Sequence, residues 1–284
     1  MRLLGAGDNV VDRYRSLGRC FPGGNAVNVA VFAARLGARS ASLGVVGDDE
    51  PGRHILGSLR QAGVDTTHVR TAHGPTAHAD VDLVGSDRVF LGSNRGVAMF
   101  SADAEQLEIM AGYDVVHCGY ASAMMDAVPV LSSRTRVSFD FGHRWTVDTV
   151  APHATHLYLA SLSAGHLDVA DTVQAVEQVV AAGARYVLAT RGAAGAFLGG
   201  PHGVTYARAE LVKAIDTLGA GDAFIATVLV HMVAGDPPES AMADAAHQAA
   251  LVCTDYGAFG YPMPYFPDGT AAVPSATSMK GATS

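Results

Sequence analysis

A glycine-rich turn with one aspartate, GAGD, comes directly before an apolar run in AIDTLGAGDAFIATVLVHM (residues 214–232). Glycine lets a turn reach positive φ or approach a ligand closely. A helix that begins near Ala220 offers unpaired N–H groups and the positive end of its dipole. The backbone of Gly219, Ala220 and Gly221 is therefore predicted to form an anion site suited to a phosphoryl group, with an ordinary turn as the simpler alternative.

Asp222 does not fit a site that only binds phosphate, because its charge would repel the anion. An ionised carboxylate on the first helical turn can instead accept the proton of a substrate hydroxyl, while backbone N–H groups hold charge on a transferred phosphoryl group. Asp222 is our candidate base, with helix capping as the alternative. The chain has no G-x-x-x-x-G-K-[ST] motif, and GAGDNV lacks the third glycine of a dinucleotide-binding turn.

Two further clusters carry polar groups that suit a sugar. Each follows a predicted strand or opens a predicted helix, where bare backbone, carboxylates and amides can meet a ligand. The residues are Asp8 and Asp12 in GDNVVD (7–12), and Gly23, Gly24, Asn25 and Asn28 in PGGNAVNVA (22–30). Turn formation and helix capping are the structural alternatives.

A third cluster, TRGAAGAF (190–197), follows another predicted strand. Thr190, Gly192 and Gly195 form a strand-to-turn corner against which a nucleotide can lie. Glycine is common at such corners, so this signal is weak by itself.

These clusters are positioned by alternating β-like and amphipathic runs. Such alternation predicts an α/β fold with a mostly parallel sheet and helices on both faces. The predicted strands are 3–7, 41–47, 114–119, 136–142, 156–161 and 186–190, and the clearest predicted helices are 26–38, 52–62 and 168–183.

Residues 78–92 break this alternation. Apolar and polar residues alternate around Gly85-Ser86-Asp87, which predicts an antiparallel hairpin that serves as a flap, with a decorative edge hairpin as the alternative. The tail 268–284 is rich in Pro, Gly, Ser and Thr, and we expect it to be disordered.

Composition narrows the function classes. The net charge of −8 and the lack of a basic block argue against a nucleic-acid partner. No apolar stretch reaches the roughly 18 residues that span a bilayer, and acidic residues come too early for a signal peptide, so we expect no membrane partner and a cytoplasmic location. Cys20, Cys118 and Cys253 fit no metal or disulfide spacing.

Taken together, four motifs resemble those of the ribokinase-like carbohydrate kinases of phosphofructokinase B type. They are GGNAVNVA, VGDDEPG (46–52), TRGAAG and DTLGAGDAF, and the likeness runs in order from about residue 3 to 260. It implies one kinase domain over 1–267, with a parallel-sheet body and a small β lid from about 13–22 and 76–97. It also implies phosphorylation of a sugar hydroxyl with ATP and Mg²⁺.

The resemblance also implies roles for individual residues. Asp222 matches the family's base, and Gly219, Ala220 and Gly221 match its anion hole. Positions that match sugar contacts are Asp12, Gly23, Gly24 and Asn28.

For the nucleotide, the resemblance implies the corner at Thr190, Arg191, Gly192 and Gly195, together with small residues beside adenine at Ala246, Ala250 and Gly257. Asp216 and the Leu218 carbonyl match positions at which many members hold a monovalent cation such as K⁺. One departure concerns Mg²⁺: Ser161 and Ala164 replace the Asn and Glu of a common Asn-x-x-Glu motif. Either ATP phosphates and water hold the ion, or another carboxylate such as Asp140 compensates.

A narrower likeness, in segments such as AGVDTTHVRTAHGPTA and FDFGHRW (139–145), is to the fructoselysine 6-kinases of that family. It implies a fructosamine substrate with an amino-acid part, whose carboxylate could meet Arg88 or Arg95. Solvated surface charge is the alternative for both arginines.

The sequence thus favours a kinase acting on a hydroxymethyl group of a ketose-like sugar, with a small-molecule sugar and ATP as its partners. A ribose, fructose or nucleoside kinase of the same family remains open. So does a sugar- or nucleotide-binding regulatory protein with weak catalysis, and a Rossmann oxidoreductase is a more distant alternative. An apolar lid face formed by Val81, Leu83, Val89 and Leu91 would favour a homodimer through the lid.

Overall fold

The fold is built on two β-sheets of unequal size. A computed structural model describes residues 1–84, 87–99 and 101–265. The side chains of residues 84, 87, 88 and 90 also fall outside the description. The expected tail 268–284 lies outside the described residues, and the domain boundary at 267 stays a prediction.

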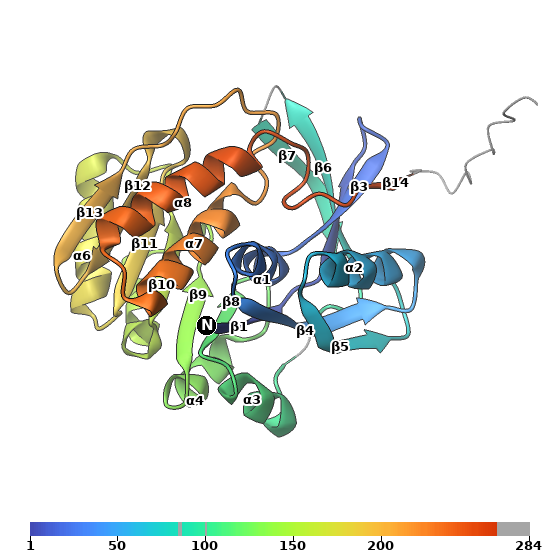
Figure 1. The fold of residues 1–284 in the computed structure, drawn as a ribbon, viewed down its shortest axis with the longest axis horizontal. Coiled ribbons are helices and arrows are strands. Elements are labelled where there is room, and N and C mark those ends of the chain that lie inside the picture. Colours follow the sequence, from blue (N-terminus) through green and yellow to red (C-terminus); the bar gives the residue numbers. More distant parts are fainter. Residues whose placement is uncertain (85–86, 100, 266–284) are drawn as a thin grey trace, which may run out of the picture.

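The larger sheet has nine strands in the spatial order β13-β12-β11-β10-β9-β8-β1-β4-β5 (Figure 1). In chain order these are β1 (Arg2–Gly7), β4 (Arg39–Gly47), β5 (Asp65–Ala72), β8 (Val115–Gly119), β9 (Arg136–Asp140), β10 (Leu159–Ser163), β11 (Tyr186–Thr190), β12 (Ala196–Gly200) and β13 (Gly203–Ala207). All strands from β11 to β5 pair in parallel, whereas β12 and β13 pair antiparallel at one edge. The predicted mostly parallel sheet is confirmed.

Helices cover both faces of this sheet. One core cluster joins it to α1 (Asn25–Arg35), α2 (Glu50–Gln61), α7 (Ala220–Ala234) and α8 (Pro238–Val252). A second cluster, on the other face, joins it to α3 (Ala104–Ala111), α4 (Val128–Ser132), α5 (Val147–Val150) and α6 (Val169–Ala181). Consecutive residues such as Leu3 and Leu4 belong to different clusters, which explains why the strands are apolar without alternation.

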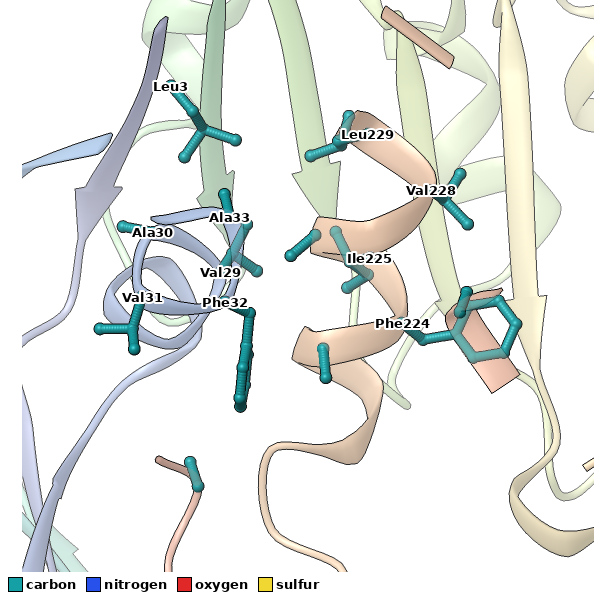
Figure 2. Packing of buried hydrophobic residues seen from close by; sticks show 14 of the residues in the cluster. Leu3, Val29, Ala30, Val31, Phe32, Ala33, Phe224, Ile225, Val228 and Leu229 are labelled. Carbon is teal, nitrogen blue, oxygen red and sulfur yellow. The ribbon is translucent and has the colours of Figure 1, made fainter. Parts of the chain in front are cut away.

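Helix α7 is buried and apolar on more than one side. Figure 2 shows it beside α1, with Ile225 and Leu229 on the side towards α1 and with Phe224 and Val228 turned away from it. An all-round apolar helix must be enclosed by other elements, and this enclosure fixes where its first turn lies.

The smaller sheet has five strands in the order β14-β3-β2-β6-β7, and it forms the lid (Figure 1). Its strands are β2 (Val10–Tyr14), β3 (Arg19–Gly23), β6 (Ala77–Val84), β7 (Asp87–Asn94) and β14 (Met263–Pro264). Strands β6 and β7 pair antiparallel, so the predicted hairpin is confirmed, although residues 85–86 at its tip lie outside the description.

The expected single apolar face of the lid is wrong. Val81 is fully buried in a cluster that includes Leu218, whereas Val89 and Leu91 are 41% and 51% exposed. The register shifts after Asp80, and Asp82 rather than Leu83 then lies opposite Val89. Since neighbouring residues of a strand point to opposite faces, the apolar side chains are divided between the two faces. The homodimer stays a prediction without this support.

The carboxyl ends of β1, β8 and β9 meet where the strand order reverses. From β1 the chain continues to β4 and β5 on one side of β1. It then returns to β8, which pairs with β1 on the other side. Such a reversal is the usual ligand-binding edge of an open α/β sheet. Among the described residues, no helix is long and apolar enough to cross a membrane.

Candidate active site

The turn before α7 has the backbone that an anion site needs. Gly219 caps the helix with φ 81°, and no side chain caps its first turn. A Cβ at Gly219 would lie 2.6 Å from the Cβ of Ala258, so both conformation and space require glycine there. A Cβ at Gly221, by contrast, would meet nothing within 4 Å. The start of α7 is therefore open to a ligand at the exposed Gly221, although the Ala220 N–H donates to the Thr217 carbonyl at 3.4 Å.

Asp222, on this first turn, is held by two asparagine side chains of α1. Asn25 Nδ2 donates to Oδ1 of Asp222 at 2.7 Å, and Asn28 Nδ2 donates to Oδ2 at 2.6 Å. Burial, with the nearby carboxylates of Asp140 and Asp8, raises the pKa of Asp222 to about 7, although the two asparagine hydrogen bonds oppose this shift. A carboxylate poised near neutral pH suits general base catalysis.

Asn25 connects three carboxylates. Its Nδ2 also donates to Asp140 Oδ2 at 3.0 Å, and its backbone N–H donates to Asp8 Oδ2 at 3.3 Å. Its Oδ1 lies 2.9 Å from Nε2 of His117, a fully buried residue of β8. Sequence reasoning missed His117, because a histidine inside the apolar run DVVHCG carries no signal of what it faces.

Polar groups expected to bind the sugar gather around the start of α1. Asp12 is 6% exposed, and a Cβ at Gly23 would lie 2.4 Å from its Oδ2, so bare backbone packs against this carboxylate. A Cβ at Gly24 would lie 2.4 Å from the Asp8 carbonyl oxygen. Oδ1 of Asp8 and Oδ1 of Asn28 are buried with no hydrogen-bond partner among the described residues. Such orphan acceptors fit the hydroxyl donors of a sugar.

The candidate nucleotide corner forms where β11 ends. Thr190 is the last residue of β11, and Gly192 begins the 3₁₀ turn Gly192–Ala194. Arg191 donates from its backbone to Gly195 and from Nη2 to the Leu167 carbonyl, so its guanidinium is directed to the loop after β10.

The small residues expected beside adenine do not all line the same pocket. Ala246 lines a pocket of about 360 Å³ with residues of β13, including Tyr206, whose ring also packs against Gly195. Ala250 is buried at 6% exposure. Gly257 lies instead against a different pocket of about 270 Å³ between α1, α7 and α8.

Asp216, the expected ligand of a monovalent cation, is fully buried and hydrogen-bonded by protein donors. Its Oδ2 accepts from the Tyr14 hydroxyl and from the Gly257 N–H, and its Oδ1 accepts from the Leu218 N–H. In the described contacts Oδ1 accepts a single hydrogen bond and keeps lone-pair capacity, so a monovalent-cation role for Asp216 and the Leu218 carbonyl stays a prediction. Sequence reasoning missed Tyr14, since nothing in its surroundings indicates a partner 202 residues away.

Asp140, at the end of β9, is likewise engaged on both oxygens. Oδ2 accepts from Asn25 and Oδ1 accepts from the Gly142 N–H at 3.1 Å, while burial raises its pKa to about 6. Ser161, which replaces the motif's Asn, hydrogen-bonds to this carboxylate, and Ala164 is fully buried. Within the described part of the chain, no group of three or more His, Cys, Asp or Glu side chains could hold a metal ion. A magnesium role for Asp140 stays a prediction.

The two lid arginines gain no support. The side chain of Arg88 falls outside the description. Arg95 is exposed beyond β7, and its Nη1 lies 3.3 Å from Met99 Sδ.

Comparison with known proteins adds to this geometry. The sequence profile of the pfkB family of carbohydrate kinases matches residues 7–130 and 146–264. The chain belongs to this family. As a pfkB kinase it is a phosphotransferase that acts on a sugar, and its expected ribokinase-like fold is confirmed.

This pfkB kinase is similar in sequence to two groups of named relatives. It is 36% identical to fructosamine kinase FrlD of Bacillus subtilis over 93% of this chain and 95% of the relative. It is 38% identical to fructoselysine 6-kinase of Shigella flexneri, over 89% of this chain and 97% of the relative.

Solved structures share its fold. Arabidopsis thaliana ribokinase, complexed with ribose and ATP, superposes with a TM-score of 0.77 at 21% identity, covering 93% of this chain and 95% of the other. Fructokinase of Vibrio cholerae, bound to fructose, ADP and calcium, has a TM-score of 0.73 at 26% identity, covering 92% and 95%.

Proposed function

We propose that this ATP-dependent sugar kinase phosphorylates the 6-hydroxyl of a fructosamine such as fructoselysine. The observation that carries the substrate class is the identity of 36% and 38% to relatives named for fructosamine and fructoselysine, spread over most of both chains. The geometry around Asp222 supports the chemistry.

Asp222 is the base in this proposal. With its pKa raised to about 7, it is largely ionised just above neutral pH and still basic enough to take a proton from a hydroxyl. Each of its oxygens accepts one asparagine hydrogen bond and keeps lone-pair capacity for the substrate hydroxyl. The asparagines therefore fix the direction of the carboxylate without blocking it.

The sugar lies against the start of α1 in this proposal. The orphan acceptors of Asp8 and Asn28, with the buried carboxylate of Asp12, would accept hydrogen bonds from its hydroxyl groups. Asn28 contacts Asp222 through Nδ2, so a sugar bound to its Oδ1 would be next to the base. This proximity is what an in-line phosphoryl transfer requires.

The transferred phosphoryl group would meet the N-terminus of α7 at Gly219, Ala220 and Gly221, where no side chain caps the helix. The ATP phosphates and water would hold Mg²⁺, which neutralises phosphate charge when bound. Thr190, Gly192, Gly195 and Ala246 would contact the nucleotide. No step of this proposal needs K⁺, and a monovalent cation at Asp216 and the Leu218 carbonyl stays a separate prediction.

ADP release tests this proposal with fructoselysine, fructose, ribose and a nucleoside as acceptors. We expect the highest kcat/KM with fructoselysine and a phosphate on O6 of the product. Asp222→Asn should fold and lose at least about 100-fold in kcat, because the base is gone. Asp168→Asn is the matched control, since the Asp168 side chain caps α6, a role that asparagine also fills well.

Two results would contradict the proposal in different ways. Near-normal turnover of Asp222→Asn would remove the base mechanism. A higher kcat/KM with ribose, fructose or the nucleoside would leave the mechanism intact and replace the substrate.

A further inference from the structure

His117 is a buried histidine that the proposed mechanism does not use. It lies in the middle of β8, between β1 and β9, with none of its surface exposed. Burial lowers its pKa to about 3, so the imidazole is neutral whenever the enzyme works. Its two ring nitrogens have one partner each: Ser138 Oγ lies 2.9 Å from Nδ1, and Asn25 Oδ1 lies 2.9 Å from Nε2.

The hydrogen bonds that link Ser138, His117 and Asn25 can run in only one direction. Asn25 must turn its NH₂ group towards Asp140 and Asp222, because those carboxylates accept. Its oxygen therefore faces His117, and an amide oxygen requires a donor, so Nε2 carries the hydrogen. A neutral imidazole has one N–H, hence Nδ1 accepts from the Ser138 hydroxyl.

The oxygen side of Asn25 is also confined by packing. A Cβ at Gly119 would lie 2.4 Å from Asn25 Oδ1, so the backbone of β8 closes in on this atom. A flipped amide would place its oxygen against the carboxylates of Asp140 and Asp222 and turn its NH₂ group to Nε2–H of His117. Both contacts would be repulsive, so a donor at Nε2 favours one orientation of Asn25.

We propose that Ser138, His117 and Asn25 form a one-way hydrogen-bond relay in which His117 is a positioning residue for the catalytic base. The relay holds the Asn25 amide in the orientation that aims Asp222 and keeps Asp140 beside it. This inference rests on the proposed role of Asp222 as the base. The charged groups that surround the relay are the carboxylates of Asp8, Asp140 and Asp222, all of which Asn25 contacts.

Three variants test the relay by ADP release. His117→Leu removes the donor, and we expect kcat to fall roughly 10- to 100-fold because the base loses its fixed direction, with less change in the KM for ATP. The acid limb of the pH profile, where kcat/KM falls as the pH drops, should move to higher pH. The reason is that the ionised form of Asp222 would lose the hydrogen bond from Asn25. His117→Gln offers an N–H to Asn25 and should recover much of both quantities.

Thr172→Val is the control for a purely structural effect. Thr172 is as buried as His117 and hydrogen-bonds only to the Asp168 carbonyl of α6 in the described contacts, far along the chain from the relay. We expect it to lower thermal stability and to leave kcat and the acid limb unchanged.

The tautomer gives a readout that does not depend on activity. In ¹⁵N NMR spectra of the wild-type enzyme, with the His117 signals assigned through their loss in His117→Gln, we expect a neutral ring protonated at Nε2 from pH 5.5 to 8. A ring protonated at Nδ1, or one that titrates in this range, would overturn the relay. A folded His117→Leu enzyme with wild-type kcat and an unmoved acid limb would also overturn the relay.

If the His117→Leu variant does not fold, the kinetics of the His117→Gln variant and the wild-type spectrum still test the relay. Failure of Asp222→Asn to lose activity would instead refute the base and leave the tautomer result standing.

Discussion

The Tyr14 hydroxyl of lid strand β2 donates a hydrogen bond to the buried carboxylate of Asp216. Asp216 lies three residues before Gly219, and it also accepts from the N–H groups of Leu218 and Gly257. One carboxylate therefore joins the lid, the turn that begins α7 and the loop after α8. A change in Tyr14 should reach the phosphoryl site through this link.

Removing the Tyr14 hydroxyl should weaken both folding and turnover. In Tyr14→Phe a fully buried carboxylate loses one of its donors, which costs about 1–3 kcal/mol in the free energy of unfolding. The turn at Gly219 should also be held less firmly, so kcat should fall. Urea unfolding and ADP release measure the two effects.

Tyr158→Phe is the matched control for that variant. The Tyr158 hydroxyl donates to the neutral Met232 carbonyl, away from the carboxylates of the site. Its removal should cost less, about 0.5–1.5 kcal/mol, with kcat unchanged. Equal losses of kcat in the two variants would mean that Tyr14 has no special connection to the phosphoryl site.

The pH dependence of the reaction should follow Asp222. Since burial raises the pKa of this carboxyl to about 7, kcat/KM should fall as the pH drops below about 7, where the base becomes protonated. Initial rates between pH 5.5 and 9 measure this limb. A limb near pH 4, the range of an unperturbed aspartate, would contradict the assignment.

The same shift has a consequence for stability, with a defined sign. The folded-state pKa lies above the unfolded value, so between pH 4 and 7 the folded protein holds a proton that the unfolded chain has lost. This contribution to stability is present at low pH and is lost as the pH rises. The unfolding free energy of the wild type, minus that of Asp222→Asn, should therefore decrease from pH 5 to pH 8.

Two glycines of the same turn should respond differently to alanine. Gly219→Ala puts a side chain at φ 81° and 2.6 Å from the Cβ of Ala258, so it should lose stability and activity together. Gly221→Ala lies in the first turn of α7 and meets nothing within 4 Å, so it should gain up to about 1 kcal/mol of stability from helix propensity.

Gly221→Ala should nevertheless lower kcat, because its methyl group enters the space that a phosphoryl group would use. Thermal denaturation and ADP release are measured on both variants. Full activity in Gly221→Ala would show that the phosphoryl group does not approach this part of the turn.

Much of this architecture could be predicted from the sequence. Apolar strands separated by amphipathic helices predicted the parallel sheet, because a sheet covered on both faces needs uninterrupted apolar strands. The GAGD turn and the GGN segment indicated where bare backbone and polar side chains would meet. The sequence predicted Asp222 as the base and Asn25 and Asn28 as sugar contacts, but not the hydrogen bonds that join them across 197 and 194 residues of the chain.

Only the tertiary structure decided which groups share hydrogen bonds. His117 and Ser138 are buried residues of two neighbouring strands, and only the register of β8 and β9 brings them together below Asn25. The expected lid face failed for a related reason, since one register shift after Asp80 changes which side chains share a face. A sequence determines the type of each element through local periodicity, whereas long-range register and burial determine what each side chain touches. The partners of Tyr14, His117 and Asp216 belong to that second kind of information.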